Sequence, residues 1–167
     1  PKLLTGDQTD IAVSVCRRVG IPSDTVLTGK DLDRMTSDEL RAAAEHTHVF
    51  AGLTPGQKVR VVSALKQNGH TTGFLGDGIN DIPALCEANV GISVDTAVDA
   101  AKDAADVILL QKDLGVLEQG ILEGRKTFTN MLKYIKITAS SNFGNILSIV
   151  CASAFLPFLP MASVQIL

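Results

Sequence analysis

Residues 76–81 read Gly-Asp-Gly-Ile-Asn-Asp, so two carboxylates and a carboxamide stand within one short turn. The residues before this turn end in the apolar pair Phe74-Leu75, which suits a buried strand, and residues 82–88 suit a helix. Asp77 should therefore lie at the carboxyl end of a strand, where open α/β sheets bind their ligands. A carboxylate there is a hard oxygen ligand for Mg²⁺, which takes one or two carboxylates beside water and phosphate oxygens. The alternative is an ordinary surface turn, in which Gly, Asp and Asn are common.

Two further segments carry groups that suit a phosphate ligand. Residues 5–7 read Thr-Gly-Asp after the strand-like residues 2–4, so the Thr5 hydroxyl stands at another predicted strand end. Residues 54–57 read Thr-Pro-Gly-Gln, a capping box with proline at the first helical position, which predicts the start of a helix. Lys58 lies in the first turn of that helix, where its charge opposes the helix dipole and a bound anion would give it a partner. A turn-forming threonine and an exposed lysine are the alternatives.

The elements that must position these groups alternate between strand and helix up to residue 113. Strand-like runs occupy residues 2–4, 26–27, 49–51, 71–75, 90–94 and 107–110. Helical patterns occupy residues 9–19, 36–45, 54–67, 82–88 and 97–105. This alternation predicts an α/β domain with a parallel, doubly wound sheet. The candidate groups should then share one edge of that sheet.

From residue 114 a helical pattern continues with no proline before Pro157. Charged residues up to Lys136 predict a cytoplasmic stalk over residues 114–136, because a lysine-rich end marks the cytoplasmic side of a span. Residues 137–167 contain no Asp, Glu, Lys, Arg or His. Since about 20 apolar residues cross a bilayer, residues 137–156 are predicted to form a transmembrane helix. Residues 157–167 would form an extracytoplasmic turn and the start of the next membrane helix.

Two asparagines, Asn142 and Asn145, interrupt the predicted span. Polar side chains in hydrocarbon are costly unless they face a partner or a water-filled cavity. Because the two residues are three apart, they share one face of a helix. We expect them to line an ion pathway, and the alternative is that they bind a neighbouring helix.

Composition limits the classes of partner. A net charge of −3 and a pI near 5.5 argue against a nucleic-acid partner, which would require a basic face. The three cysteines lie far apart without a CxxC spacing, so neither a zinc site nor a disulfide framework is indicated, and we expect buried, reduced thiols. The chain opens with Lys-Leu-Leu, as if inside a strand, and lacks a signal segment. We expect it to be part of a longer polypeptide.

Taken together, residues 5–7, Lys58 after Thr54-Pro55, and residues 76–81 with the following Pro-Ala-Leu resemble the last part of a P-type ATPase phosphorylation domain, which has the haloacid-dehalogenase-type fold. Residues 138–145 and 155–160 resemble the fifth membrane helix of bacterial magnesium-transporting P-type ATPases. The resemblance covers essentially the whole chain. It implies that residues 1–113 are the C-terminal part of the phosphorylation domain. It also implies a multi-pass protein of the bacterial inner membrane, with residues 1–136 in the cytoplasm.

The resemblance implies catalytic roles for five residues. Asp77 would hold the catalytic Mg²⁺. Lys58 and Thr5 would neutralise and hydrogen-bond the phosphoryl oxygens, and Asn80 would bond the same group. Asp81 would orient Lys58 or a nearby water molecule. Such groups suit phosphoryl transfer, in which positioning and charge stabilisation supply most of the catalysis.

The resemblance also implies an ATP-binding edge formed by Thr5, Gly6, Asp7 and Lys58. Three positions depart from the family pattern: Gly52 replaces an arginine that is usual near the nucleotide, Gln8 replaces asparagine, and Ile82 replaces alanine.

Family members are phosphorylated on an aspartate in Asp-Lys-Thr-Gly-Thr, a string that this sequence does not contain. The nucleophile, the nucleotide-binding domain and the earlier membrane helices are therefore expected upstream. The implied function is that of a fragment of an ATP-driven cation pump that imports Mg²⁺ through an aspartyl phosphate. Its cofactors would be Mg²⁺ and ATP, and its partners the transported divalent cation, the lipid bilayer and the rest of the same polypeptide. The alternatives are a soluble phosphatase of the same fold and a non-catalytic, membrane-tethered remnant.

Overall fold

The structure is a computed structural model that describes residues 1–111 and 113–155. The chain divides into two units, one from Pro1 to Asp113 and one that begins at Leu114. Each unit is described by itself below.

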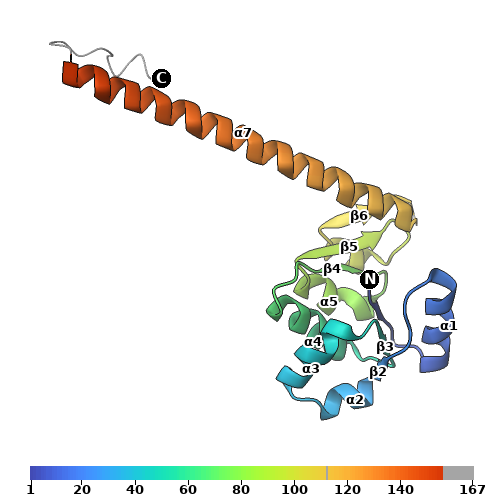
Figure 1. The fold of residues 1–167 in the computed structure, drawn as a ribbon. Coiled ribbons are helices and arrows are strands. Elements are labelled where there is room, and N and C mark those ends of the chain that lie inside the picture. Colours follow the sequence, from blue (N-terminus) through green and yellow to red (C-terminus); the bar gives the residue numbers. More distant parts are fainter. Residues whose placement is uncertain (112, 156–167) are drawn as a thin grey trace. The chain divides into compact units, whose positions relative to one another are not determined.

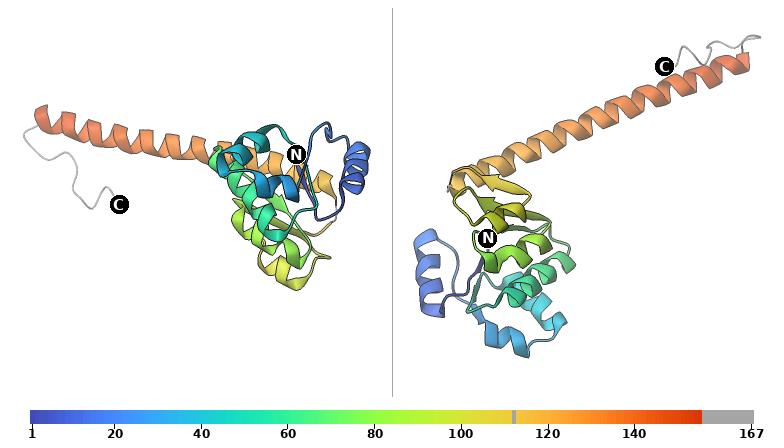
Figure 2. Two further views of the ribbon diagram at one scale, coloured as in Figure 1. Left: turned by 90° about the horizontal axis from the view of Figure 1, so that it is seen from below. Right: turned by 180° about the vertical axis from the view of Figure 1, so that it is seen from behind.

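The first unit alternates strands with helices, as the sequence pattern predicts (Figures 1 and 2). Its strands are β1 (Leu3–Leu4), β2 (Val26–Thr28), β3 (Val49–Ala51), β4 (Gly73–Leu75), β5 (Val90–Val94) and β6 (Val107–Leu109). Its helices are α1 (Thr9–Val19), α2 (Gly29–Arg34), α3 (Ser37–His46), α4 (Pro55–Gln67), α5 (Ile82–Glu87) and α6 (Asp99–Asp103), with a 3-10 turn η1 (Ile79–Asp81) before α5.

The strands form two parallel sheets of three strands each, in the orders β1-β3-β2 and β4-β5-β6. The α/β class and the parallel pairing are confirmed. The single doubly wound sheet that we expected is not seen, because the hydrogen bonds of the described residues pair β1 with β3 and β4 with β5. A strand pattern in the sequence identifies a strand but not its neighbour, so pairing had to come from the fold.

The first sheet is covered on both faces. Phe50 packs with residues of α3 and α4, whereas its neighbours Val49 and Ala51 pack against Ala12 and Cys16 of α1. All three residues of β3 are fully buried. Figures 1 and 2 show α1 on one side of β3 and the pair α3 and α4 on the other. Alternate residues of a strand point to opposite faces, so β3 contributes to two hydrophobic clusters at once.

Helix α1 buries a different face from the one with the larger apolar residues. Ile11, Val15 and Val19 are spaced for one helix face, yet they are 53%, 43% and 57% exposed. The small residues Ala12 and Cys16 are buried instead. All three cysteines are free, but Cys86 and Cys151 are exposed, so the expectation of buried thiols was wrong for two of them.

The second unit contains α7 (Leu114–Phe155), a single helix of 42 residues (Figure 1). None of its residues is buried. Within residues 1–111 and 113–155, no helix combines the length and the apolar character needed to cross a membrane, so the predicted transmembrane helix at 137–156 is not confirmed. The turn and second membrane helix predicted at 157–167 lie outside the described residues. Asn142 and Asn145 lie on α7 and are exposed.

Candidate functional site

The turn 76–81 follows the carboxyl end of β4, as predicted from the sequence. The Gly76 N–H donates to the carbonyl of Ile92 in β5 at 3.0 Å, which continues the pairing of β4 with β5 past the strand end. A Cβ atom on Gly76 would lie 2.5 Å from the Cβ of Asp81. Glycine is therefore required here because Asp81 folds back against the start of its own turn. The Gly78 N–H, at 3.4 Å from Asp81 Oδ2, supports the same fold-back.

Lys58 forms an ion pair with this turn. Its Nζ donates to Asp81 Oδ1 at 2.6 Å, and the two side chains are only 10% and 16% exposed. The interpretation of Lys58 as an ordinary exposed lysine is therefore wrong. A buried charge of this kind is stable only with its partner and supporting hydrogen bonds. The pair joins the first turn of α4 to the turn that carries Asp77.

The first turn of α4 is held in place by Gln57, a residue for which the sequence predicted only a capping role. The predicted capping box forms, with the Thr54 N–H donating to Gln57 Oε1 at 2.9 Å. The Gln57 amide nitrogen also donates to the Gly29 carbonyl at 3.0 Å and to Asp33 Oδ1 at 2.7 Å. Gln57 is 7% exposed. These bonds connect the start of α4, beside Lys58, to α2. No local sequence pattern links these two helices.

Thr5 and Asp7 form a second polar group at the carboxyl end of β1. The Thr5 hydroxyl donates to Asp7 Oδ2 at 3.0 Å, and the Asp7 N–H donates back to Thr5 Oγ1 at 3.1 Å. The Leu53 N–H donates to the Thr5 carbonyl at 3.0 Å, so this turn is attached to the loop that enters α4. The described side-chain hydrogen bonds therefore join Thr5 to Asp7 and, separately, Lys58 to Asp81.

Gly6 and Gly52 lie in the same region as this second group. The Gly52 N–H donates to the Asp7 carbonyl at 2.7 Å. Gly52 has φ of +62°, in the left-handed region that favours glycine. Gly52, which replaces the arginine usual in the family, therefore adopts a backbone conformation that favours glycine.

Asp77 and Asn80 are exposed at the surface of the turn 76–81. The Asp77 carbonyl accepts a hydrogen bond from the Val98 N–H at 3.2 Å, which fixes the backbone beneath its carboxylate. Among the described residues, no group of three or more His, Cys, Asp or Glu side chains could enclose a metal ion. Mg²⁺ does not need such a cage, because it keeps several waters and binds one or two carboxylates with phosphate oxygens. The exposed Asp77 carboxylate fits that donor set.

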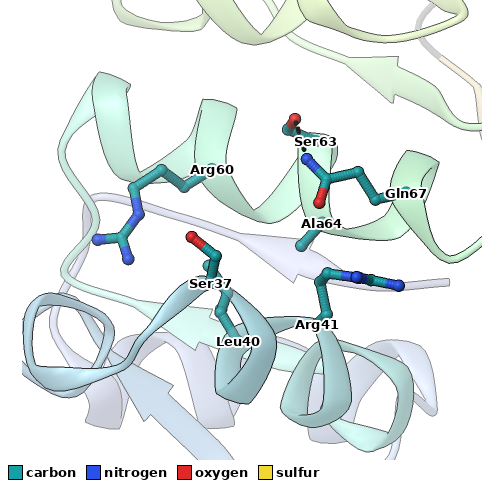
Figure 3. A pocket seen from close by; sticks show the side chains of 7 residues that line it. All are labelled: Ser37, Leu40, Arg41, Arg60, Ser63, Ala64 and Gln67. Carbon is teal, nitrogen blue, oxygen red and sulfur yellow. Dashed lines mark hydrogen bonds between the residues drawn. The ribbon is translucent and has the colours of Figure 1, made fainter.

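A separate small pocket of about 130 Å³ lies between α3 and α4 (Figure 3). It is lined by Ser37, Leu40, Arg41, Arg60, Ser63, Ala64 and Gln67. Figure 3 shows the guanidinium groups of Arg41 and Arg60 directed away from each other. Arg60 donates to the Met35 carbonyl at 3.2 Å and Arg41 to Asn68 Oδ1 at 3.2 Å. The pocket contains none of the predicted site residues, and its two cations do not converge on one ligand.

Comparison with known proteins gives the same family as the motifs. A family model described as haloacid dehalogenase-like hydrolase matches residues 58–119. The chain is 57% identical over 166 residues to the magnesium-transporting ATPase, P-type 1, of Escherichia coli (strain K12), and equally to that of Salmonella typhimurium (strain LT2). It is 38% identical over 173 residues to the probable cation-transporting ATPase F of Mycobacterium tuberculosis (strain H37Rv).

These alignments cover 99% of this chain, but the chain spans only 18% of the length of the magnesium-transporting relatives and 19% of the mycobacterial one. A solved structure of a zinc-transporting PIB-type ATPase in its E2.Pi state is similar with a TM-score of 0.71 and 27% identity, over 90% of this chain and 21% of that one. The predicted resemblance is confirmed. The chain therefore belongs to the P-type ATPase family and corresponds to a segment of its members that includes haloacid dehalogenase-like sequence.

Proposed function

We propose that this chain is a segment of an ATP-driven cation pump that imports Mg²⁺, and that an aspartate outside the chain carries the phosphoryl group during turnover. The observation that carries the proposal is the buried ion pair between Lys58 and Asp81, which fixes a cation next to the turn that bears Asp77. A cation held in a site shielded from water stabilises developing negative charge much more than one in solvent.

In this proposal Asp77 would hold the catalytic Mg²⁺, which when bound neutralises charge on the phosphoryl oxygens. Asp81 keeps the ammonium group of Lys58 oriented, and Lys58 neutralises the same oxygens. The exposed carboxamide of Asn80 and the hydroxyl of Thr5 donate hydrogen bonds to the phosphoryl group. In the described contacts the Thr5 hydroxyl donates to Asp7, so Thr5 would exchange that bond for one to the ligand.

The ATP-binding edge would be formed by the turn 5–7 together with Lys58. Asp7 is exposed and Gly6 offers no side chain, so a nucleotide can approach the backbone of this turn closely. The bond from Leu53 to Thr5 gives this turn and the helix of Lys58 a common anchor.

We further propose that residues 1–136 are cytoplasmic and that the membrane-crossing part lies in the uncharged sequence 137–167, which extends beyond the described residues. Support comes from the absence of any charged residue over those 31 positions and from relatives named as transporting ATPases. Asn142 and Asn145 would line the cation path. The protein would then sit in a bacterial inner membrane as a multi-pass pump.

The proposal is tested in the complete polypeptide that contains this chain. Asp77→Asn should abolish Mg²⁺-dependent ATP hydrolysis, whereas Asp38→Asn, which alters an exposed carboxylate of α3, should leave it unchanged. Asn142→Ala and Asn145→Ala should lower Mg²⁺ uptake more than they lower phosphoenzyme formation. Full hydrolysis by the Asp77→Asn variant would refute the catalytic role, and normal uptake by both asparagine variants would make these residues packing residues.

A further inference from the structure

Ser93 is a polar residue in the middle of a buried strand. It lies in β5, where residues 91–94 are all buried, and its own exposure is 0%. Its hydroxyl donates to the carbonyl of Gly76 at 3.0 Å. A buried hydroxyl without a hydrogen-bond partner is destabilising. The bond to Gly76 supplies that partner and allows a serine at this position of β5. It also connects the strand to the residue that directly precedes Asp77.

The hydrogen bonds around Asp77 fix the peptide groups on both of its sides. The Gly76 N–H donates to Ile92 at 3.0 Å, and the Gly76 carbonyl accepts from Ser93. The Asp77 carbonyl accepts from the Val98 N–H at 3.2 Å. Gly76 has more backbone freedom than residues with a side chain, because it has no Cβ. Without the Ser93 hydroxyl, the peptide between Gly76 and Asp77 would lose the bond to its carbonyl oxygen.

We propose that Ser93 is a positioning residue for the metal site: its hydroxyl holds the Gly76–Asp77 peptide so that the Asp77 carboxylate is presented to Mg²⁺. The inference rests on the proposed role of Asp77 as the Mg²⁺ ligand. Groups that orient a metal ligand through a hydrogen bond typically change metal affinity by about 10- to 100-fold when they are removed. A purely structural role for Ser93 would instead lower the stability of the domain and leave metal affinity unchanged.

The two roles are separated by measuring metal binding and unfolding on the same variants. The full 167-residue chain in detergent micelles is titrated with Mn²⁺, a paramagnetic substitute for Mg²⁺, and line broadening of the Asp77 and Gly78 amide NMR signals is followed. Thermal unfolding is recorded in parallel. The variants are Asp77→Asn, Ser93→Ala, Ser93→Thr and, as a control, Ser63→Ala, whose hydroxyl lies on α4 and accepts from Gln67.

We expect Asp77→Asn to remove the site-specific broadening and Ser93→Ala to weaken Mn²⁺ binding about tenfold. Ser93→Thr, which keeps a hydroxyl, should recover most of that loss, and Ser63→Ala should bind like the unaltered chain. Excess Mg²⁺ should reverse the broadening. If Ser93→Ala unfolds at a lower temperature but binds Mn²⁺ as tightly as the unaltered chain, the positioning role is refuted while the metal role of Asp77 stands. If the unaltered chain shows no broadening that depends on Asp77, the metal role fails, and the inference on Ser93 fails with it.

Discussion

Phe50 in β3 and Phe128 in α7 have the same side chain in opposite surroundings. Phe50 is 0% exposed and lies in a cluster with residues of α2, α3 and α4, whereas Phe128 is 57% exposed. The contrast extends to the whole of each unit, because the first unit has a buried core and none of the residues of α7 is buried. The same amino acid therefore contributes to stability only where distant parts of the chain enclose it.

The largest effect should come from emptying the core. Phe50→Ala should lower the free energy of unfolding of the α/β unit by about 3–5 kcal/mol, because a large buried ring is lost and a cavity replaces it. Phe128→Ala is the matched control and should leave that unfolding free energy unchanged. Urea unfolding followed by circular dichroism measures both. Equal losses for the two variants would show that α7 is part of the same cooperative core.

Ion pairs give a second, smaller contrast between the units. Lys58→Met leaves Asp81 largely buried without its cation and should lower the free energy of unfolding by about 2 kcal/mol. This is below the roughly 3–5 kcal/mol typical of fully buried pairs, because both side chains retain some exposure. Lys126→Met in α7 breaks a pair of similar length, 2.7 Å to Glu123, whose side chains are 67% and 53% exposed. That change should cost less than about 0.5 kcal/mol.

The double variant Lys58→Met with Asp81→Asn sharpens this contrast. Because it removes the unpaired charge, it should be more stable than Lys58→Met alone. If Lys58→Met lowers the free energy of unfolding no more than Lys126→Met does, the Lys58–Asp81 pair is solvated in solution.

The smallest predicted effect is the pH dependence of the stability that comes from carboxylates at the starts of helices α2 and α3. The backbone N–H and then the hydroxyl of Thr36 lower the pKa of Glu39 in the capping box of α3. The Thr28 hydroxyl, followed by its backbone N–H, lowers the pKa of Asp31 in the same way. Helix α7 has no acidic residue in its first turn. Stability that comes from these two carboxylates should therefore depend on pH in the α/β unit alone.

The sign follows from the direction of the shift. Since the folded pKa lies below the ordinary values of 4.5 for Glu39 and 3.8 for Asp31, the stabilisation is complete above those values and is lost as the pH falls through the lowered pKa. The stability difference between the unaltered chain and Glu39→Ala should shrink on acidification. Unfolding midpoints measured in urea from pH 6 to pH 3 test this, and a difference that does not vary with pH would contradict it.

Most of the local order was predicted from the sequence, but helix α2 (Gly29–Arg34) was not, although its capping box between Thr28 and Asp31 is local. The alternation of strands and helices, the capping box at Thr54 and the strand ends before Thr5 and Asp77 all appear as predicted. These features depend on residues within one or two helical turns of each other, so a short window of sequence contains the information. The family likewise followed from motifs that occur together.

Only the tertiary structure decided which of these residues meet. Lys58 and Asp81 are 23 positions apart. The family resemblance implied that Asp81 orients Lys58 or a water molecule, but only the structure shows that the two side chains form a buried ion pair. The burial of Ala12 and Cys16 in place of Ile11 and Val15, and the role of Ser93 in β5, depend in the same way on distant strands and helices. Burial and hydrogen bonding between such segments arise from packing of the whole chain, because solvent is excluded only where elements from different parts of the sequence come together.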